Sequence, residues 1–172
     1  SGLMISGSTL TNCVFRNSRA ANYVQCSNCT FHDCLFHDNY VNNNGGGLVY
    51  KSTLYRCAFS NNYGDCANGL CVNGSTCHDC TFYGNVCSNT TYYCGGTGYG
   101  GRYYNCHFER NRTVNYFPRA GALRMPAYAS NCVFIANAAG QGGAVSAGQY
   151  SLPAMTNCWV VDSFFTNNHA YG

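Results

Sequence analysis

The chain has 172 residues, a formal net charge of +3 and only 9% charged residues. A net charge this small argues against a nucleic-acid-binding protein. No run of 18 apolar residues is present to predict a helix that spans a bilayer. Solubility must come from Asn, Ser and Thr rather than from charge. Together with the 14 cysteines, this composition predicts an extracellular or cell-surface protein.

A short strand motif recurs along the chain. Its core is Cys-x-Phe, an alternation that directs both side chains to one face of a strand. There are six full copies and a degenerate seventh: Cys13 with Phe15, Cys34 with Phe36, Cys57 with Phe59, Cys80 with Phe82, Cys106 with Phe108, Cys132 with Phe134, and Cys158. The first six cysteines are separated by 21, 23, 23, 26 and 26 residues. A period of this size indicates a solenoid of stacked repeats.

Each repeat also carries an earlier strand signal. Glycine followed by apolar residues begins at positions 2, 47, 69 and 121, ten or eleven residues before a motif cysteine, and again at 143. No helical periodicity is present, and the abundant Asn, Gly, Tyr and Thr favour turns and strands. One such rung cannot bury its apolar face alone. We therefore predict an all-β parallel solenoid of about seven rungs, with one domain over residues 1–172 and no visible cap at either end.

In such a stack, equal positions lie about 4.8 Å apart. The Phe residues are then predicted to form an aromatic column and the seven motif cysteines a column of small buried side chains. A ladder of amides is predicted at a turn, where each Asn can bond its own kind. Its members are Asn39, Asn62, Asn85, Asn111, Asn137 and Asn168, with Asn17 or Ser18 in the first copy. Just before the cysteines, Asp33, Arg56 and Asp79 would alternate in charge and favour this register.

These motifs resemble the repeats of parallel β-helix proteins of bacterial surfaces. The likeness is to polymorphic outer-membrane-protein and autotransporter-passenger repeats, which carry GGA(I/L/V) and FxxN motifs. The matching segments here include Gly142-Gly143-Ala144-Val145 and Phe36-His37-Asp38-Asn39. The resemblance covers nearly the whole chain and implies a right-handed parallel β-helix. It leaves function open, because such repeats serve adhesins, structural fibres and enzymes.

Seven further cysteines lie outside the column. We predict disulfides among them in an oxidising compartment, with those at 66, 87 and 94 foremost. The candidates are Cys26, Cys29, Cys66, Cys71, Cys77, Cys87 and Cys94. The segment Cys29-Thr30-Phe31 is an extra copy of the motif and leaves two registers open for the second rung. Cys26-x-x-Cys29 with His32 and Cys77-x-x-Cys80 with His78 look like zinc half-sites, but their separation is outside the usual spacing, so we predict no metal site.

Catalysis is the rival class, because lyases and hydrolases of polysaccharides share this fold. They need clustered carboxylates. The six carboxylates show no evident cluster: Asp33, Asp38, Asp65, Asp79, Glu109 and Asp162. The glycine-rich run 96–101 contains GxGxxG, but a strand follows it rather than a helix, which indicates a turn. We therefore expect no catalytic residues and no cofactor.

Two features concern partners. Five arginines are predicted to be scattered and solvated, with a patch for acidic glycans or phospholipid headgroups as the alternative: Arg102, Arg110, Arg112, Arg119 and Arg124. The two ends of the chain are also in phase. From Asn168, through a junction of the two ends, to Cys13 is 17 residues, close to the internal step of 18 from Asn39 to Cys57.

These features predict a structural protein that stacks head-to-tail with copies of itself into a filament. The contact would join residues 1–15 to residues 155–171, and a Pro or Lys placed inward near Val14 would block it. The alternative is a fragment of an adhesin passenger that binds a host surface or a glycan. A polysaccharide lyase or hydrolase-like enzyme is the third reading.

Overall fold

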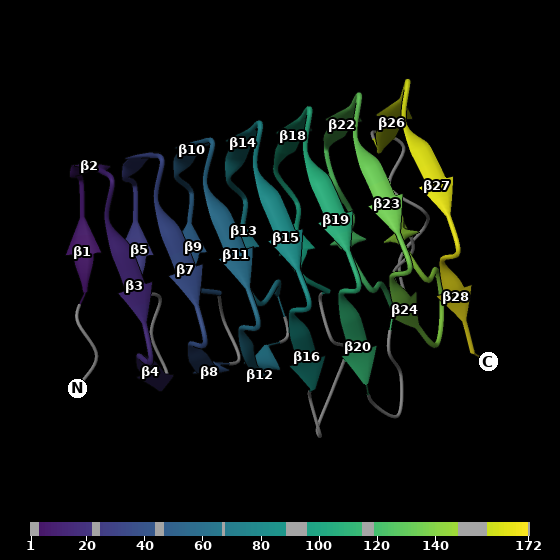
Figure 1. The fold of residues 1–172 in the computed structure, drawn as a ribbon, viewed down its shortest axis with the longest axis horizontal. Coiled ribbons are helices and arrows are strands. Elements are labelled where there is room, and N and C mark those ends of the chain that lie inside the picture. Colours follow the sequence, from purple (N-terminus) through teal and green to yellow (C-terminus); the bar gives the residue numbers. More distant parts are fainter. Residues whose placement is uncertain are drawn as a thin grey trace.

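The computed structural model describes residues 4–21, 25–43, 47–66, 68–88, 96–114, 119–147 and 158–171. All regular secondary structure in these segments is β-strand, and the strands form four sheets of seven strands each. Every pairing between strands of neighbouring rungs is parallel (for example β3 with β7 and β23 with β27). Figure 1 shows the rungs stacked side by side, with the two termini at opposite ends of the stack. The predicted all-β parallel β-helix is confirmed, while its hand stays a prediction.

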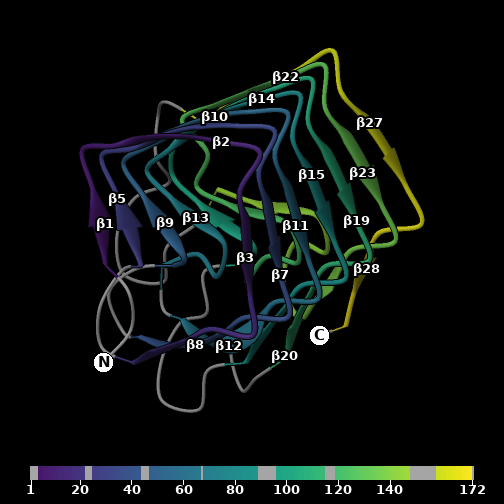
Figure 2. The ribbon, with the colours of Figure 1, turned by 60° about the vertical axis from the view of Figure 1, so that its left-hand side comes forward.

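Each rung contributes one strand to each of the four sheets, which form the four sides seen in Figure 2. Sheet A contains β1 (Ile5–Ser6), β5 (Cys26–Ser27), β9 (Val49–Tyr50), β13 (Val72–Asn73), β17 (Gly98–Tyr99), β21 (Leu123–Arg124) and β25 (Val145–Ser146). Sheet B contains β2 (Thr9–Thr11), β6 (Thr30–His32), β10 (Thr53–Tyr55), β14 (Thr76–His78), β18 (Arg102–Tyr104), β22 (Tyr128–Ser130) and β26 (Trp159–Val161).

The other two sides complete the rung. Sheet C contains β3 (Val14–Arg16), β7 (Leu35–His37), β11 (Ala58–Ser60), β15 (Thr81–Tyr83), β19 (His107–Glu109), β23 (Val133–Ile135) and β27 (Phe164–Thr166). Sheet D contains β4 (Arg19–Ala21), β8 (Tyr40–Asn43), β12 (Tyr63–Cys66), β16 (Val86–Ser88), β20 (Arg112–Val114), β24 (Ala138–Ala139) and β28 (His169–Ala170). The sequence had predicted at least two strands per repeat, and the structure has four.

Within most rungs the inward residues of sheets A to D follow one another at intervals of five residues. In the second rung Cys26, Phe31, Phe36 and Val41 are the inward residues of sheets A to D, and all four are buried. Two-residue corners join most neighbouring strands within a rung, and the first corner residue has left-handed backbone. Between sheets B and C its φ is 47–54° at Asn12, Asp33, Arg56, Asp79, Asn105, Asn131 and Asp162. Asn and Asp tolerate this conformation better than other non-glycine residues, which explains their frequency at this corner.

The aromatic column lies on the inner face of sheet C. Successive rings stack with centroids 4.5–5.1 Å apart and planes within 10° of parallel. The five rings from Phe36 to Phe134 are completely buried. Phe165 of the last rung continues the column as a seventh ring, stacked on Phe134. The predicted column is therefore confirmed and extended by one residue.

Sheets A and B have a more varied interior. The extra motif Cys29-Thr30-Phe31 belongs to sheet B, where Phe31 pairs in register with Leu10 and Leu54. At the fifth rung the large Tyr103 fills the core, and Gly98 of sheet A faces it. A Cβ added at Gly98 would lie 2.5 Å from the Tyr103 hydroxyl oxygen, so only glycine leaves room for the ring.

Charges at the corner between sheets B and C support the register. Arg56 donates two hydrogen bonds to Asp33 of the rung before, at 2.7 and 2.8 Å. The hydrogen bond from Arg56 lowers the pKa of the Asp33 carboxyl. Asn105 donates to Asp79 in the same row. The predicted alternation of Asp33, Arg56 and Asp79 is present, although exposed pairs of this kind contribute little to stability.

Replacing Phe82 by Ala should lower the free energy of unfolding by about 3–5 kcal/mol, because it opens a cavity and interrupts the ring column. Urea unfolding followed by circular dichroism measures the change. The control is Thr81→Ala in the same strand, where the exposed side chain should change stability by less than about 0.5 kcal/mol. Equal effects of the two substitutions would contradict the inward assignment of Phe82.

Candidate functional site: the assembly interface

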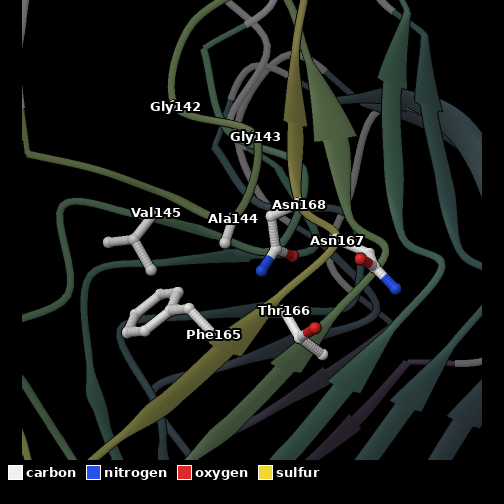
Figure 3. A pocket seen from close by; sticks show the side chains of 8 residues that line it. All are labelled: Gly142, Gly143, Ala144, Val145, Phe165, Thr166, Asn167 and Asn168. Carbon is white, nitrogen blue, oxygen red and sulfur yellow. The ribbon is translucent and has the colours of Figure 1, made fainter.

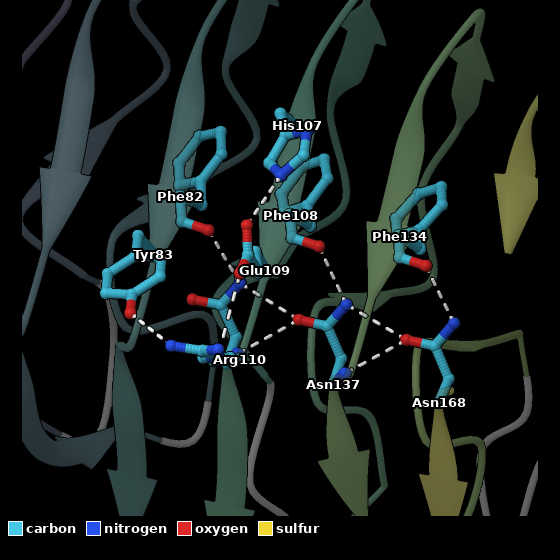
Figure 4. A network of polar contacts seen from close by, with 10 residues as sticks. Phe82, Tyr83, His107, Phe108, Glu109, Arg110, Phe134, Asn137 and Asn168 are labelled. Atoms are coloured by element: carbon cyan, nitrogen blue, oxygen red, sulfur yellow. Dashed lines mark hydrogen bonds and ion pairs between the residues drawn. The ribbon is translucent and has the colours of Figure 1, made fainter. Parts of the chain in front are cut away.

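An amide ladder runs between sheets C and D (Figure 4). Asn39, Asn62, Asn85, Asn111 and Asn137 are at most 1% exposed, and Asn168 ends the row. Each Nδ2 donates to Oδ1 of the Asn in the next rung at 2.9–3.0 Å. It also donates to a Phe carbonyl of the rung before. The predicted ladder is confirmed, and it satisfies polar groups that would otherwise be costly to bury.

The ladder has a direction and two different ends. In the first rung the Ser18 backbone N–H donates to Asn39 Oδ1 at 3.0 Å, so Ser18 occupies the position that Asn holds in later rungs. Asn17 is the corner residue before it, with a φ of 50°. At the other end, Asn168 Nδ2 donates to the Phe134 carbonyl at 2.9 Å. Within the described residues no further rung follows Asn168. Its backbone N–H and its second amide hydrogen therefore point toward where the next rung would lie.

A row of thiols runs beside the Phe column. We call it the thiol column, and its members are Cys13, Cys34, Cys57, Cys80, Cys106 and Cys132. Cys34 to Cys132 are buried and Cys13 is half-buried. The prediction that Cys158 continues this column is wrong. Cys158 precedes β26 of sheet B, whereas the column residues precede strands of sheet C. Ser163 holds the seventh position of the column and accepts a hydrogen bond from the Cys132 backbone N–H at 3.2 Å.

The predicted disulfides are largely wrong for the described side chains. Cys26, Cys29 and Cys77 are free thiols buried in the core. Burial, with Cys29 and Cys34 close by, raises the pKa of Cys26 to about 12. Cys71 is also a thiol, and its sulfur lies 4.0 Å from Asn62 Nδ2. These inward positions give the thiols a packing role as small apolar side chains.

One candidate differs from this group. Cys87 is disulfide-bonded. The side chains of Cys66 and Cys94 lie outside the described residues, so their predicted pairing stays a prediction.

The last rung carries a cavity of about 520 Å³ (Figure 3). It is lined by Gly142, Gly143, Ala144 and Val145 of the sheet A segment and by Phe165, Thr166, Asn167 and Asn168 of sheet C and the following corner. Glycine is required at both positions. A Cβ on Gly143 would lie 2.5 Å from the His169 carbonyl oxygen, and Gly142 has a φ of 59°. Phe165 is 46% exposed beside this cavity, although the five inner rings of its column are completely buried.

The inward side chains of the first rung are also incompletely buried. Ile5, Leu10, Cys13 and Phe15 are only partly buried, although the corresponding residues of the inner rungs belong to the core. Val14 is 59% exposed and points away from the core. The inward residue next to it is Phe15, so the expectation of an inward substitution near Val14 has to be corrected to Phe15.

The outer faces of the sheets carry the charged side chains that could be considered for catalysis or metal binding. On sheet C and its corner, His107 lies 3.1 Å from Glu109, and Arg110 donates to the Tyr83 hydroxyl at 2.7 Å (Figure 4). Asp38 lies 2.6 Å from His37. No group of three or more His, Cys, Asp or Glu side chains that could hold a metal ion exists among the described residues. The same residues contain no helix long and apolar enough to cross a membrane.

The two remaining motifs have structural roles. The glycine-rich run forms β17, a corner at Gly100 and Gly101, and the start of the path into β18, as the turn interpretation predicted. The five arginines do not form one solvated group. Arg119 and Arg124 are only 3% exposed, and Arg124 lies over the ring of Tyr99 at 5.4 Å.

Comparisons with protein-family models, with curated proteins and with solved structures find no match to this chain.

Replacing Asn85 by Leu should lower the free energy of unfolding by about 3 kcal/mol or more. The substitution leaves one hydrogen of the Asn62 amide and the Asn62 backbone N–H without an acceptor, and removes the amide hydrogen bond to the Phe59 carbonyl. Each unsatisfied buried group costs about 1–3 kcal/mol. Urea unfolding gives the value. The control is Asn42→Leu on the outer face of sheet D, where the exposed side chain should leave stability within about 0.5 kcal/mol. An unchanged midpoint for Asn85→Leu would rule out a stabilising ladder.

Proposed function

We propose that this chain is an extracellular structural protein whose rungs stack head-to-tail, copy upon copy, into a filament. One observation carries the proposal: the inward side chains of the last rung are exposed or only partly buried, at positions that are buried in every inner rung. Phe165 is 46% exposed, whereas Phe134, one rung earlier, is completely buried. The exposed surface of the last rung matches a further rung of the same kind in shape and in strand register.

The first rung of a second copy offers the matching groups. Its Phe15 would stack on Phe165, as Phe36 stacks on Phe15 within the chain at 4.5 Å. Its Ser18 hydroxyl would take the position of an Asn Oδ1 and accept from Asn168. Burying one Phe side chain contributes roughly 1.5–3 kcal/mol. Backbone hydrogen bonds along four strand edges would add to this, since parallel edges are ready templates for pairing.

The contact is heterologous, because it joins the last rung of one copy to the first rung of the next. Such a contact repeats along the axis unless a rotation closes it into a ring. An opposed arrangement, last rung to last rung, would bring two Asn168 donor groups together and would not form parallel sheets. The proposed filament is therefore polar and unbranched.

Location is part of the proposal. The Cys87 disulfide supports an extracellular or cell-surface site, because disulfides persist in oxidising compartments. The free thiols of the inner rungs do not oppose this, since burial keeps them from reacting.

A second candidate is a surface protein whose outer faces bind a host surface or a glycan. Trp159 and Phe164 favour it, because they are 59% and 60% exposed on the outer faces of sheets B and C. Exposed aromatic side chains of this kind mark interaction sites more often than isolated aliphatic ones. Discrete rods that never elongate and bind a polysaccharide through Trp159 would select this candidate over the filament.

Replacing Phe165 by Lys should abolish filament growth, because a charge would be buried at the proposed contact. Sedimentation velocity and negative-stain microscopy across a concentration series give the readout, and circular dichroism shows that the rungs remain folded. The matched control is Phe164→Lys in the same strand, which points outward and should assemble like the unmodified chain. If the unmodified chain remains monomeric at every concentration, the filament proposal fails.

A further inference from the structure

The outer face of sheet C carries a row of side chains that is apolar at both ends and polar in the middle. The first residue of each strand contributes to this row, and the strands pair it in register. In rung order the members are Val14, Leu35, Ala58, Thr81, His107, Val133 and Phe164. Val14 is 59% exposed and Phe164 is 60% exposed. Figure 1 shows their strands, β3 and β27, at opposite ends of the stack.

Head-to-tail stacking would join the two apolar ends of this row. The proposed contact pairs β27 of one copy with β3 of the next. In the register that stacks their two Phe rings, Val14 of the next copy lies beside Phe164, just as Val133 does within the chain. The joined row then holds five successive apolar residues. We call it the apolar stripe, and its members are Val133 and Phe164 of one copy and Val14, Leu35 and Ala58 of the next.

We propose that the apolar stripe holds two filaments of this chain side by side, so that the assembled fibre is a pair of filaments. Contiguous exposed apolar surface marks an interaction site, whereas single exposed apolar side chains do not. The inference rests on the proposed filament, because a single chain carries the stripe only as two separate halves.

The spacing of the stripes identifies a second filament as the partner. Each copy adds seven rungs to the stack, so the stripe recurs every seven rungs, roughly 34 Å at the strand spacing. Another filament of the same chain presents the same stripes at the same spacing, so all the stripes along its length are covered together. Weak contacts that are repeated in this way act as one multivalent contact. Any twist of the stack would wind the two filaments around each other and keep the stripes in contact.

Charge favours one direction for the second filament. Asp162 lies at the corner on the sheet B side of the stripe, and Arg16 of the next copy lies on the side nearer sheet D, one rung further along. Both side chains are exposed, and neither belongs to an ion pair among the described residues. Two filaments that run in the same direction bring the Asp162 side of each stripe against the Arg16 side of the other. Exposed charges add little affinity, but they select the matching orientation.

Substitutions in each half of the stripe test the inference. Negative-stain electron microscopy should show paired filaments for the unmodified chain. Phe164→Ser and Val14→Ser should each give single filaments of unchanged length, because both side chains point outward and take no part in the axial contact. The same holds for Phe164→Lys, which changes pairing and leaves growth along the axis intact.

Trp159→Ser is the matched control. Trp159 belongs to the same rung as Phe164 and is 59% exposed, but it lies on sheet B. Its row continues into polar Thr9 and Thr30 of the next copy, so it lies outside the apolar stripe. Filaments of this variant should remain paired.

Salt separates an apolar contact from a charged one. Each copy carries a formal net charge of +3, so the filaments repel each other at low ionic strength. Sodium chloride screens this repulsion and sodium sulfate also strengthens apolar contacts, so pairing should increase with either salt. Sedimentation velocity of the dilute chain, before filaments form, should show no lateral dimer, because the two halves of the stripe are still apart.

Four results would overturn the inference. Unmodified filaments that stay single would do so and leave the filament proposal standing, whereas a chain that never elongates would overturn both. Pairs that dissolve in salt would indicate a charged contact. Filaments of Phe164→Ser and Val14→Ser that remain paired would place the contact outside the stripe. Single filaments that bind a polysaccharide through Phe164 would instead favour the second candidate function.

Discussion

The structure depends on one constraint, the parallel in-register pairing of each rung with the next. Backbone hydrogen bonds fix the rungs at about 4.8 Å, so every side chain lies against its equivalents above and below. In the Phe, Asn and thiol columns, each residue is suited to its position because it can pack against or bond its own kind. Phe does so through stacked rings, Asn through an amide that both donates and accepts, and Cys through a small side chain whose thiol donates to a carbonyl of its own rung. A charged residue cannot, and the Phe, Asn and thiol columns contain none.

Much of this arrangement could be predicted from the sequence, because three columns repeat one residue type. The recurring Cys, Phe and Asn positions predict how each rung aligns with the next. The ion pair between Asp33 and Arg56 agrees with this alignment. The other sides were hidden because their inward residues vary. Sheet A uses Ile5, Cys26, Val49 and Gly98 at one position, since a pair such as Gly98 and Tyr103 can share the volume. A position whose residue type changes from rung to rung gives no recurring motif that could be recognised in the sequence.

The assignment of Cys158 failed for a related reason. Cys-Trp-Val at 158–160 matches the motif by letter, but the column position five residues later is filled by Ser163. Serine can replace cysteine there because the position requires a small side chain that accepts a backbone hydrogen bond. The disulfide predictions failed at Cys26, Cys29 and Cys77 because composition indicates a compartment and says nothing about which side chains point inward. Thiols at inward positions are accounted for by packing alone.

The amide ladder has an electrical consequence. From Asn39 to Asn168 every side-chain amide is oriented alike, with its oxygen toward the preceding rung and its nitrogen reaching toward the following one. Their dipoles therefore add along the solenoid axis, as peptide dipoles add along an α-helix. Each hydrogen bond also polarises its neighbours in the chain of bonds. The row of aligned amides thus gives the solenoid two electrically different ends. Adding one more rung to the stack strengthens the amide hydrogen bonds already present.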